Sequence, residues 1–193
     1  MPSYLSTLLA LGALGNVATA ANIYTYTRPG CQGCGFFAKD IGPNVCALTI
    51  TGTANSTKEA ITRGLTTVQS GKLQAWNPGQ KHFLSWGAGP DKNDDGPLQC
   101  GTVQTDAPVT QHETCISQPA TGFSWYEAGN DGKKRDVKKC TSTKEVDGIV
   151  GPDGTHYSLS GASAEDAAAM KDLAANGASE VPANMDKYKV SSD

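Results

Sequence analysis

The sequence predicts a mainly β protein, an antiparallel sandwich or barrel with one C-terminal helix, held by disulfides as a stapled α+β fold. Three observations lead to this prediction. Short segments of strand-forming residues alternate with turn signals every ten to fifteen residues. One stretch near the C-terminus has helix-forming residues with capping residues at both ends. Six cysteines are spread between residues 31 and 140, a usage typical of exported, disulfide-stapled proteins.

The strand predictions rest on runs of β-branched and aromatic residues that end at glycine, proline or asparagine. Seven such segments lie at 23–27, 45–51, 73–76, 81–86, 101–103, 112–116 and 122–126. A hairpin is predicted further along, with strands 146–150 and 155–159 on either side of the turn 151–154. Turn signals at this spacing favour an antiparallel sandwich or barrel.

Two helices are expected. The first is ambiguous: Ser56 to Glu59 reads as a capping box, so a short helix can sit among the strands at 56–64. The second runs from a cap at Ser163 to a stop at Gly177, with acidic residues in its first turn. Its apolar stripe contains Met170, which we expect to be a packing residue.

The first twenty residues predict a cleavable signal peptide. An apolar run too short to span a bilayer is followed by small residues that fit a cleavage site after Ala20. The expected organisation is therefore a signal peptide at 1–20 and a single secreted domain at 21–193. Within that domain, a β-rich core at 21–130 precedes a hairpin-plus-helix part at 136–193. No later segment is apolar enough to predict a membrane span, so we expect an extracellular protein.

An even number of cysteines in an exported chain predicts disulfides, and sequence alone leaves fifteen pairings open. The six predicted bridge residues are Cys31, Cys34, Cys46, Cys100, Cys115 and Cys140. The Cys31-Gln32-Gly33-Cys34 motif also has the form of a redox dithiol, which would need its first thiolate at a helix N-terminus. The segment 35–41 leaves room for two helical turns at most, and no alternating strand-helix pattern follows. A structural bridge is therefore favoured over redox catalysis.

Three further motifs are candidate sites. Asn55 begins an N-glycosylation sequon in a segment that reads as an exposed turn. Asp91, Asn93 and Asp95 match the opening of a calcium loop, but Thr102 stands where the loop needs a bidentate acid, so an acidic turn is favoured.

The third motif is a dibasic pair. Lys134 and Arg135 lie in a polar stretch and form a processing site after Arg135, or else a plain exposed loop. If the chain were cut there, Cys140 could hold the two pieces together.

Composition narrows the function classes. The net charge of −3 argues against a nucleic-acid partner. The three histidines are far apart, and no nucleophile elbow or zinc-protease motif is present, so no catalytic residue, cofactor or metal site is predicted. Trp76, Trp86, Trp125 and the tyrosines can form a sugar-stacking platform, although core positions are favoured for the tryptophans.

Four features of the sequence resemble a known group of proteins. They are the signal peptide, the strand at 23–26, the cysteines from Cys31 to Cys115 and the Gly-Phe-Ser-Trp run at 122–125. Together they resemble the small secreted cysteine-rich proteins of filamentous fungi, many of which look like effector candidates. The likeness covers roughly residues 22–126. Because that group is heterogeneous, the resemblance implies export and interaction with a host, and assigns no catalytic residue.

Three functions remain open at this point. The first is a non-enzymatic, virulence-type effector that binds a host extracellular protein such as a defence protease or receptor. The second is a carbohydrate- or cell-wall-binding protein that uses exposed aromatic residues. The third is a thiol-disulfide oxidoreductase that uses Cys31 and Cys34.

Overall fold

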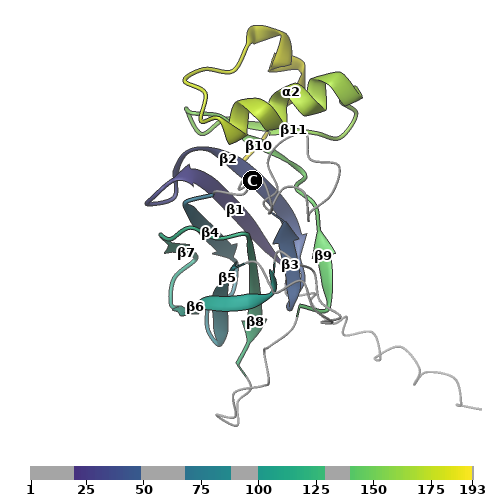
Figure 1. The fold of residues 1–193 in the computed structure, drawn as a ribbon. Coiled ribbons are helices and arrows are strands. Elements are labelled where there is room, and N and C mark those ends of the chain that lie inside the picture. Colours follow the sequence, from purple (N-terminus) through teal and green to yellow (C-terminus); the bar gives the residue numbers. More distant parts are fainter. Residues whose placement is uncertain (1–19, 49–67, 88–99, 129–139, 193) are drawn as a thin grey trace, which may run out of the picture.

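Two β-sheets face each other in the computed structural model, which describes residues 20–48, 68–87, 100–128 and 140–192 (Figure 1). The seven-stranded sheet has the order β12-β11-β10-β2-β1-β4-β7. Its strands are β1 (Ala21–Arg28), β2 (Gln32–Ile41), β4 (Ser70–Ala75), β7 (Glu113–Ile116), β10 (Gly148–Val150), β11 (His156–Ser158) and β12 (Lys189–Val190). The predicted mainly β fold is thereby confirmed.

The second sheet has five strands in the order β6-β5-β8-β3-β9. Its strands are β3 (Val45–Leu48), β5 (Lys81–Gly87), β6 (Thr102–Val109), β8 (Gly122–Glu127) and β9 (Ser142–Lys144). The pairs in both sheets are antiparallel except β3 with β9, which run parallel. The short β9 was not predicted, because three residues are too few to produce an alternating pattern.

The segment after the Cys-x-x-Cys motif is where the sequence prediction is wrong. Instead of a short helical stretch, residues 32–41 form β2, the longest of the strands that the structure describes. Phe36 lies in the core between the sheets, whereas Phe37 is buried on the opposite face beside Tyr24. Because both faces of this strand are covered, its apolar residues form a continuous run and the period-2 signal is lost.

The core lies between the sheets and has one close backbone approach. Phe123 of β8 lies over Gly71 of β4 so closely that a Cβ at residue 71 would come within 2.4 Å of the ring. Trp125 of the same strand donates from its indole nitrogen to the Ile41 carbonyl at 2.9 Å, tying the five-stranded sheet to the end of β2.

Trp86 and Trp125 are fully buried, as expected. Trp76 is 74% exposed, so its predicted core position is wrong.

The C-terminal hairpin extends the seven-stranded sheet. β10 pairs with β2, and the predicted hairpin of β10 and β11 is confirmed, with Gly154 in the turn at a φ of +83°. The expected helix is also confirmed as α2 (Ala164–Ala175), and the Ser163 hydroxyl accepts from the Asp166 amide at 3.1 Å. A 3₁₀ helix, η2 (Ala183–Tyr188), follows it. The possible short helix at 56–64 lies outside the described residues.

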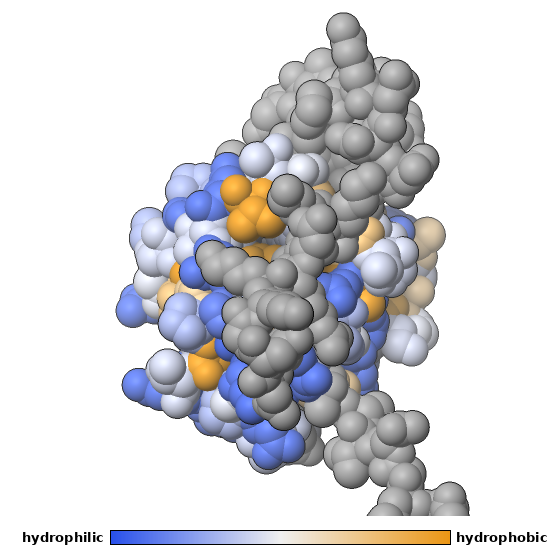
Figure 2. All heavy atoms as spheres, turned by 90° about the horizontal axis from the view of Figure 1, so that it is seen from below, coloured by the Kyte–Doolittle hydropathy of each residue, from blue (hydrophilic) through white to orange (hydrophobic). Residues whose placement is uncertain are grey.

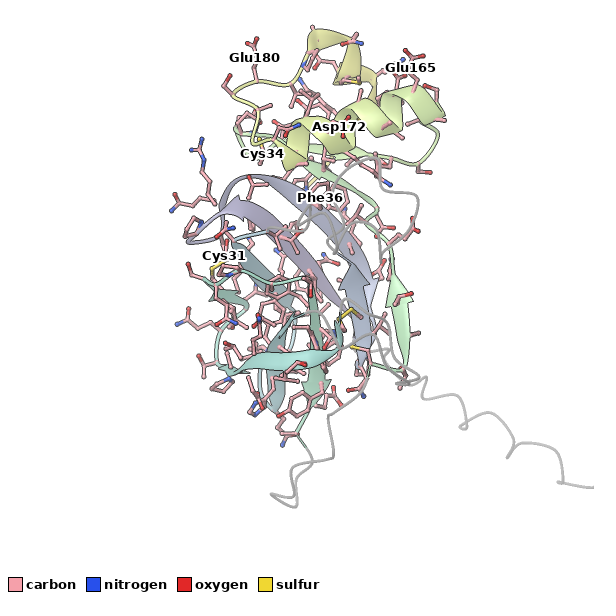
Figure 3. The ribbon with its side chains drawn as sticks, in the orientation of Figure 1. Cys31, Cys34, Phe36, Glu165, Asp172 and Glu180 are labelled. Atoms are coloured by element: carbon pink, nitrogen blue, oxygen red, sulfur yellow. A yellow bond between two sulfur atoms is a disulfide. The ribbon has the colours of Figure 1, made fainter. Side chains whose placement is uncertain are left out.

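Helix α2 covers the part of the sheet that the five-stranded sheet does not reach. It packs on β2 and β10, while η2 packs on β11. Met170, Ala174 and Met185 belong to the same buried cluster as Phe36 and as Phe83, Phe123 and Trp125 of the five-stranded sheet. Figure 3 shows Phe36 in the strands beneath α2, with Glu165 and Glu180 pointing outward. The predicted packing role of Met170 is confirmed.

In the view from the end opposite α2, the described residues that are visible are mainly hydrophilic, with hydrophobic residues in small separate patches (Figure 2). None of the helices in the described ranges is long and apolar enough to cross a membrane.

Truncating Met170 tests whether α2 is part of the core. Met170→Ala should lower the free energy of unfolding by about 2–5 kcal/mol, because it removes a fully buried side chain and leaves a cavity. Glu180→Ala, at an exposed position after the same helix, should change it by about 0.5 kcal/mol or less. Urea denaturation followed by circular dichroism gives both values. Equal effects of the two variants would contradict a shared core.

Candidate functional site

The Cys-x-x-Cys motif is split between the two faces of the seven-stranded sheet. Cys31 sits in the tight turn between β1 and β2, with a φ of +57°, and is bridged to Cys115 of β7. Cys34 lies within β2, buried, and its thiol donates to the Ala178 carbonyl at 3.0 Å. Figure 3 shows the two cysteines apart, Cys34 on the side of α2 and Cys31 at the corner of the sheet.

This geometry corrects two expectations about the motif. Cys34 is not in a bridge, because strand alternation directs it toward the Phe36 side of the sheet while Cys31 meets its partner on the opposite side. The helix N-terminus that a redox dithiol needs is replaced by a β-strand. Burial raises the pKa of the Cys34 thiol, which opposes thiolate chemistry. The geometry and the buried thiol of Cys34 therefore argue against the oxidoreductase alternative.

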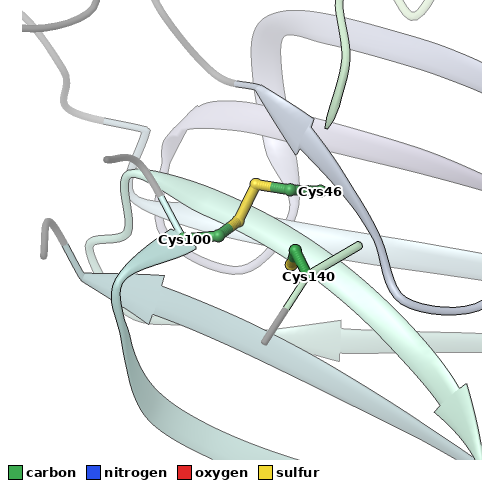
Figure 4. A group of neighbouring side chains, drawn as sticks. All are labelled: Cys46, Cys100 and Cys140. Carbon is green, nitrogen blue, oxygen red and sulfur yellow. A yellow bond between two sulfur atoms is a disulfide. The ribbon is translucent and has the colours of Figure 1, made fainter. Parts of the chain in front are cut away.

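The second bridge joins Cys46 of β3 to Cys100, just before β6. Cys140 is a buried free thiol next to this bridge, so its predicted pairing is also wrong in this structure. The three sulfur atoms all lie within 4.8 Å of one another (Figure 4). A bridge between two of them leaves the third without a bonding partner, since each sulfur forms one disulfide bond. Four of the six cysteines thus form bridges.

A groove of about 710 Å³ lies on the outer face of the seven-stranded sheet, and we call it the outer-sheet groove. The strand register brings its residues together: Tyr24 of β1 lies opposite Lys72 of β4, and Gln74 lies opposite Glu113 of β7. On the other side of β1, Tyr26 faces Gly35, a residue without a side chain. Arg28, Gln32, Asp153 and His156 also line the groove.

Polar groups of both kinds line the groove. The Lys72 ammonium lies 3.1 Å from Glu113 Oε1 and 5.1 Å from the centre of the Tyr24 ring. Gln74 Oε1 accepts from the Tyr24 hydroxyl at 3.2 Å, and Gln74 Nε2 donates to Glu113 at 3.5 Å. At another part of the lining, the Asp153 carboxylate accepts from the Thr155 hydroxyl at 2.7 Å. The Thr155 amide also donates to this carboxylate, at 3.0 Å. The two hydrogen bonds hold the pKa of Asp153 below its usual range, so the carboxylate is ionised at neutral pH.

Aromatic rings and one histidine lie beneath these polar groups. His156 stacks on Phe37 at 5.1 Å between ring centroids and lies 5.4 Å from the Tyr24 ring. Burial, followed by the positive charges of Lys39 and Lys72, lowers the pKa of His156, so the ring is neutral at neutral pH. Its Nδ1 is buried without a hydrogen-bond partner. This histidine therefore acts as part of the groove floor and not as a fixed charge.

The three histidines lie in separate places. His82 Nδ1 lies 2.6 Å from Asp106 Oδ1 on the five-stranded sheet, where the Tyr126 hydroxyl donates to the same carboxylate at 3.0 Å. His112 lies beside the exposed Trp76, at 5.2 Å between ring centroids. His156 alone lines the groove, so the histidines do not form one site.

The remaining sequence candidates are not placed. Asn55, the acidic loop with Asp91, Asn93 and Asp95, and the dibasic pair Lys134 and Arg135 all lie outside the described residues. The groove itself was missed, although the alternation in Tyr24-Thr25-Tyr26 puts both tyrosines on one face. That pattern does not show which face is the core. Only strand pairing brings Lys72 and Glu113 next to the tyrosines.

A family model described as an N-terminal domain, ARB_05566_N, matches residues 22–148. No curated protein and no solved structure matches the chain. The matched region ends at the first residue of β10, so α2 and the rest of the C-terminal hairpin lie beyond it.

Protonating His156 should destabilise the fold. Its pKa is lowered in the folded state relative to 6.5, so the stability it contributes is complete above that pH and is lost as the pH falls through the folded pKa. We expect the free energy of unfolding to fall as the pH is lowered below 6.5 toward the folded pKa of His156. His156→Phe, which cannot titrate and keeps an aromatic ring, should flatten this dependence. The control, His112→Phe at an exposed position, should leave the pH dependence of stability unchanged. Urea denaturation at each pH measures the free energy of unfolding of both variants.

Thiol titration checks the cysteine assignment. In denaturant, two thiols per chain should react with Ellman's reagent, those of Cys34 and Cys140. In the folded protein at pH 8 both should react slowly, because each is buried, and burial raises the pKa of Cys140 to about 11. A rapid reaction of either thiol in the folded protein would contradict the structure.

Proposed function

The chain belongs to the ARB_05566_N family, and we propose that it is a secreted, non-enzymatic protein that binds an uncharged carbohydrate in the outer-sheet groove. The observation that carries this proposal is the lining of the groove, which combines hydrogen-bond donors and acceptors above aromatic rings. Lys72 and Arg28 supply donors, and Glu113 and Asp153 supply acceptors.

The mixed charges favour an uncharged polyhydroxylated ligand. A sugar hydroxyl both donates and accepts, so neighbouring groups of opposite kind are complementary to it. A phosphate or polyanion would meet Glu113 and Asp153, and a polycation would meet Lys72 and Arg28. A groove of about 710 Å³ is within the usual size range for a small-ligand site, enough for a short oligosaccharide.

The electrostatics of the groove support binding over hydrolysis. A glycosidase needs one carboxylic acid whose pKa is raised, so that it can protonate the leaving oxygen. The pKa of Asp153 is shifted in the opposite direction by the Thr155 hydrogen bonds. Glu113 forms an ion pair with Lys72 at 3.1 Å. Ionised carboxylates of this kind are hydrogen-bond acceptors for ligand hydroxyls.

The start of the fold supports export. The proposed cleavage after Ala20 falls immediately before β1, whose first residue, Ala21, is 2% exposed. Removing the leader would therefore leave complete every strand that the structure describes. The disulfide Cys31–Cys115 fastens the turn after β1 to β7, next to the groove, and such bridges persist in an oxidising compartment.

The test is binding of the mature protein, beginning at Ala21, to an array of neutral cell-wall oligosaccharides, followed by calorimetry on the best ligand. Glu113→Gln should weaken that binding about tenfold, about 1.4 kcal/mol, because it removes a charged acceptor from the groove. The matched control is Glu127→Gln, which removes the acid of the Lys81 ion pair on the other sheet and should leave the affinity unchanged.

Two outcomes would overturn the proposal. One is the absence of binding to any neutral glycan, and the other is an equal loss of affinity in both variants. Capture of a host extracellular protein without glycan binding would instead support the effector function that the fungal resemblance implies.

A further inference from the structure

We propose that Cys46, Cys100 and Cys140 form an exchangeable disulfide centre, in which the Cys140 thiol can replace either bridged cysteine. Figure 4 shows Cys140 beside the bond between the other two. All three sulfur atoms are buried and lie within 4.8 Å of one another, so the attacking and leaving atoms are already neighbours.

The exchange is balanced without any external oxidant. The Cys140 thiolate attacks the sulfur of Cys46 or Cys100, a new sulfur–sulfur bond forms and the existing bond breaks. The electron pair of the broken bond remains on the released cysteine, which takes up the proton that Cys140 lost. The number of bridges and free thiols is the same before and after the exchange.

The backbone that follows Cys140 is held against β3 and the residue before it. Strand β9 pairs in parallel with β3, so that Ser142 lies opposite Val45 and Thr143 lies opposite Cys46. The Thr141 amide donates to the Asn44 carbonyl at 2.8 Å, next to Cys140. The position of the thiol is therefore set by strand pairing and does not depend on the existing bridge.

The surroundings of the sulfur atoms favour internal exchange over reaction with dissolved thiols. The cluster also contains Leu84, Trp86 and Tyr126, and the three cysteines are each 5% exposed or less. A bulky dissolved thiol has little access to such a bridge, whereas Cys140 is already inside it. The Ser124 hydroxyl hydrogen-bonds to Cys140 and partly offsets the cost of forming a buried thiolate.

Exchange changes which parts of the chain are tied together. The observed bridge ties β3 to Cys100, two residues before β6, whereas a bridge from Cys140 ties residues 140–192 to the earlier part of the chain. If the chain is cut after Arg135, only a Cys140 bridge keeps the two pieces covalently joined. The centre would then decide whether the cut protein is one covalent unit.

Cys34 is the matched control within the same chain. It too is a buried free thiol, but it lies on the α2 side of the seven-stranded sheet and donates to Ala178. The Cys31–Cys115 bridge belongs to the opposite side of that sheet. Cys34 should therefore stay unpaired under conditions in which Cys140 exchanges.

The experiment maps disulfides by mass spectrometry after refolding in a glutathione redox buffer, with acid quenching and alkylation before digestion. In Cys100→Ser, Cys46 should pair with Cys140, and in Cys46→Ser, Cys100 should pair with Cys140. The wild-type protein, held folded at mildly alkaline pH and then quenched, should contain a Cys140 bridge beside the Cys46–Cys100 bridge. Cys34→Ser should show the wild-type pattern.

The wild-type measurement keeps the proposal falsifiable even if a variant fails to fold. Detection of only the Cys46–Cys100 bridge in the folded wild-type protein, with Cys140 recovered as a free thiol, would overturn the proposal. So would a Cys100→Ser protein that is folded and has Cys46 and Cys140 both free.

Discussion

The apolar inner face of the seven-stranded sheet has to be covered along its whole width, and two different elements cover it. The five-stranded sheet packs over the part formed by β1 and β4, where Phe123 lies against Gly71. Helix α2 packs over β2 and β10. Burying this face is the main favourable contribution to folding, so the hairpin, the helix and both sheets depend on one continuous core.

With the core between the layers, the two bridges lie on the outside of the sandwich. Cys31–Cys115 lies on the groove face of the seven-stranded sheet, and Cys46–Cys100 lies with Leu84 and Trp86 in a separate buried cluster. Neither bridge passes through the main core. They fasten the turn between β1 and β2 to β7, and β3 to the segment before β6.

The proposed glycan groove and the proposed exchange centre follow from this arrangement. The groove lies on the outer face of the wide sheet, where Lys72, Glu113 and Tyr24 from neighbouring strands meet by register alone. The three sulfur atoms meet for a similar reason, because β9 pairs with β3 beside a bridge that already exists. The two centres lie on different sheets, so each can be altered without the other.

Local patterns in the sequence were sufficient for the elements that local interactions define. The strand at Ile23 to Thr27, the hairpin around Gly154 and the helix capped by Ser163 all follow from residues close together in the chain. The longest strand, β2, was not foreseen, because burial on both faces removes alternation, and the groove was not foreseen because strand pairing assembles it. Cysteine count alone predicted bridges for all six residues. Tertiary structure decided which of them meet, since a disulfide requires two sulfur atoms on the same face at bonding distance, and Cys34 and Cys140 have no such free partner.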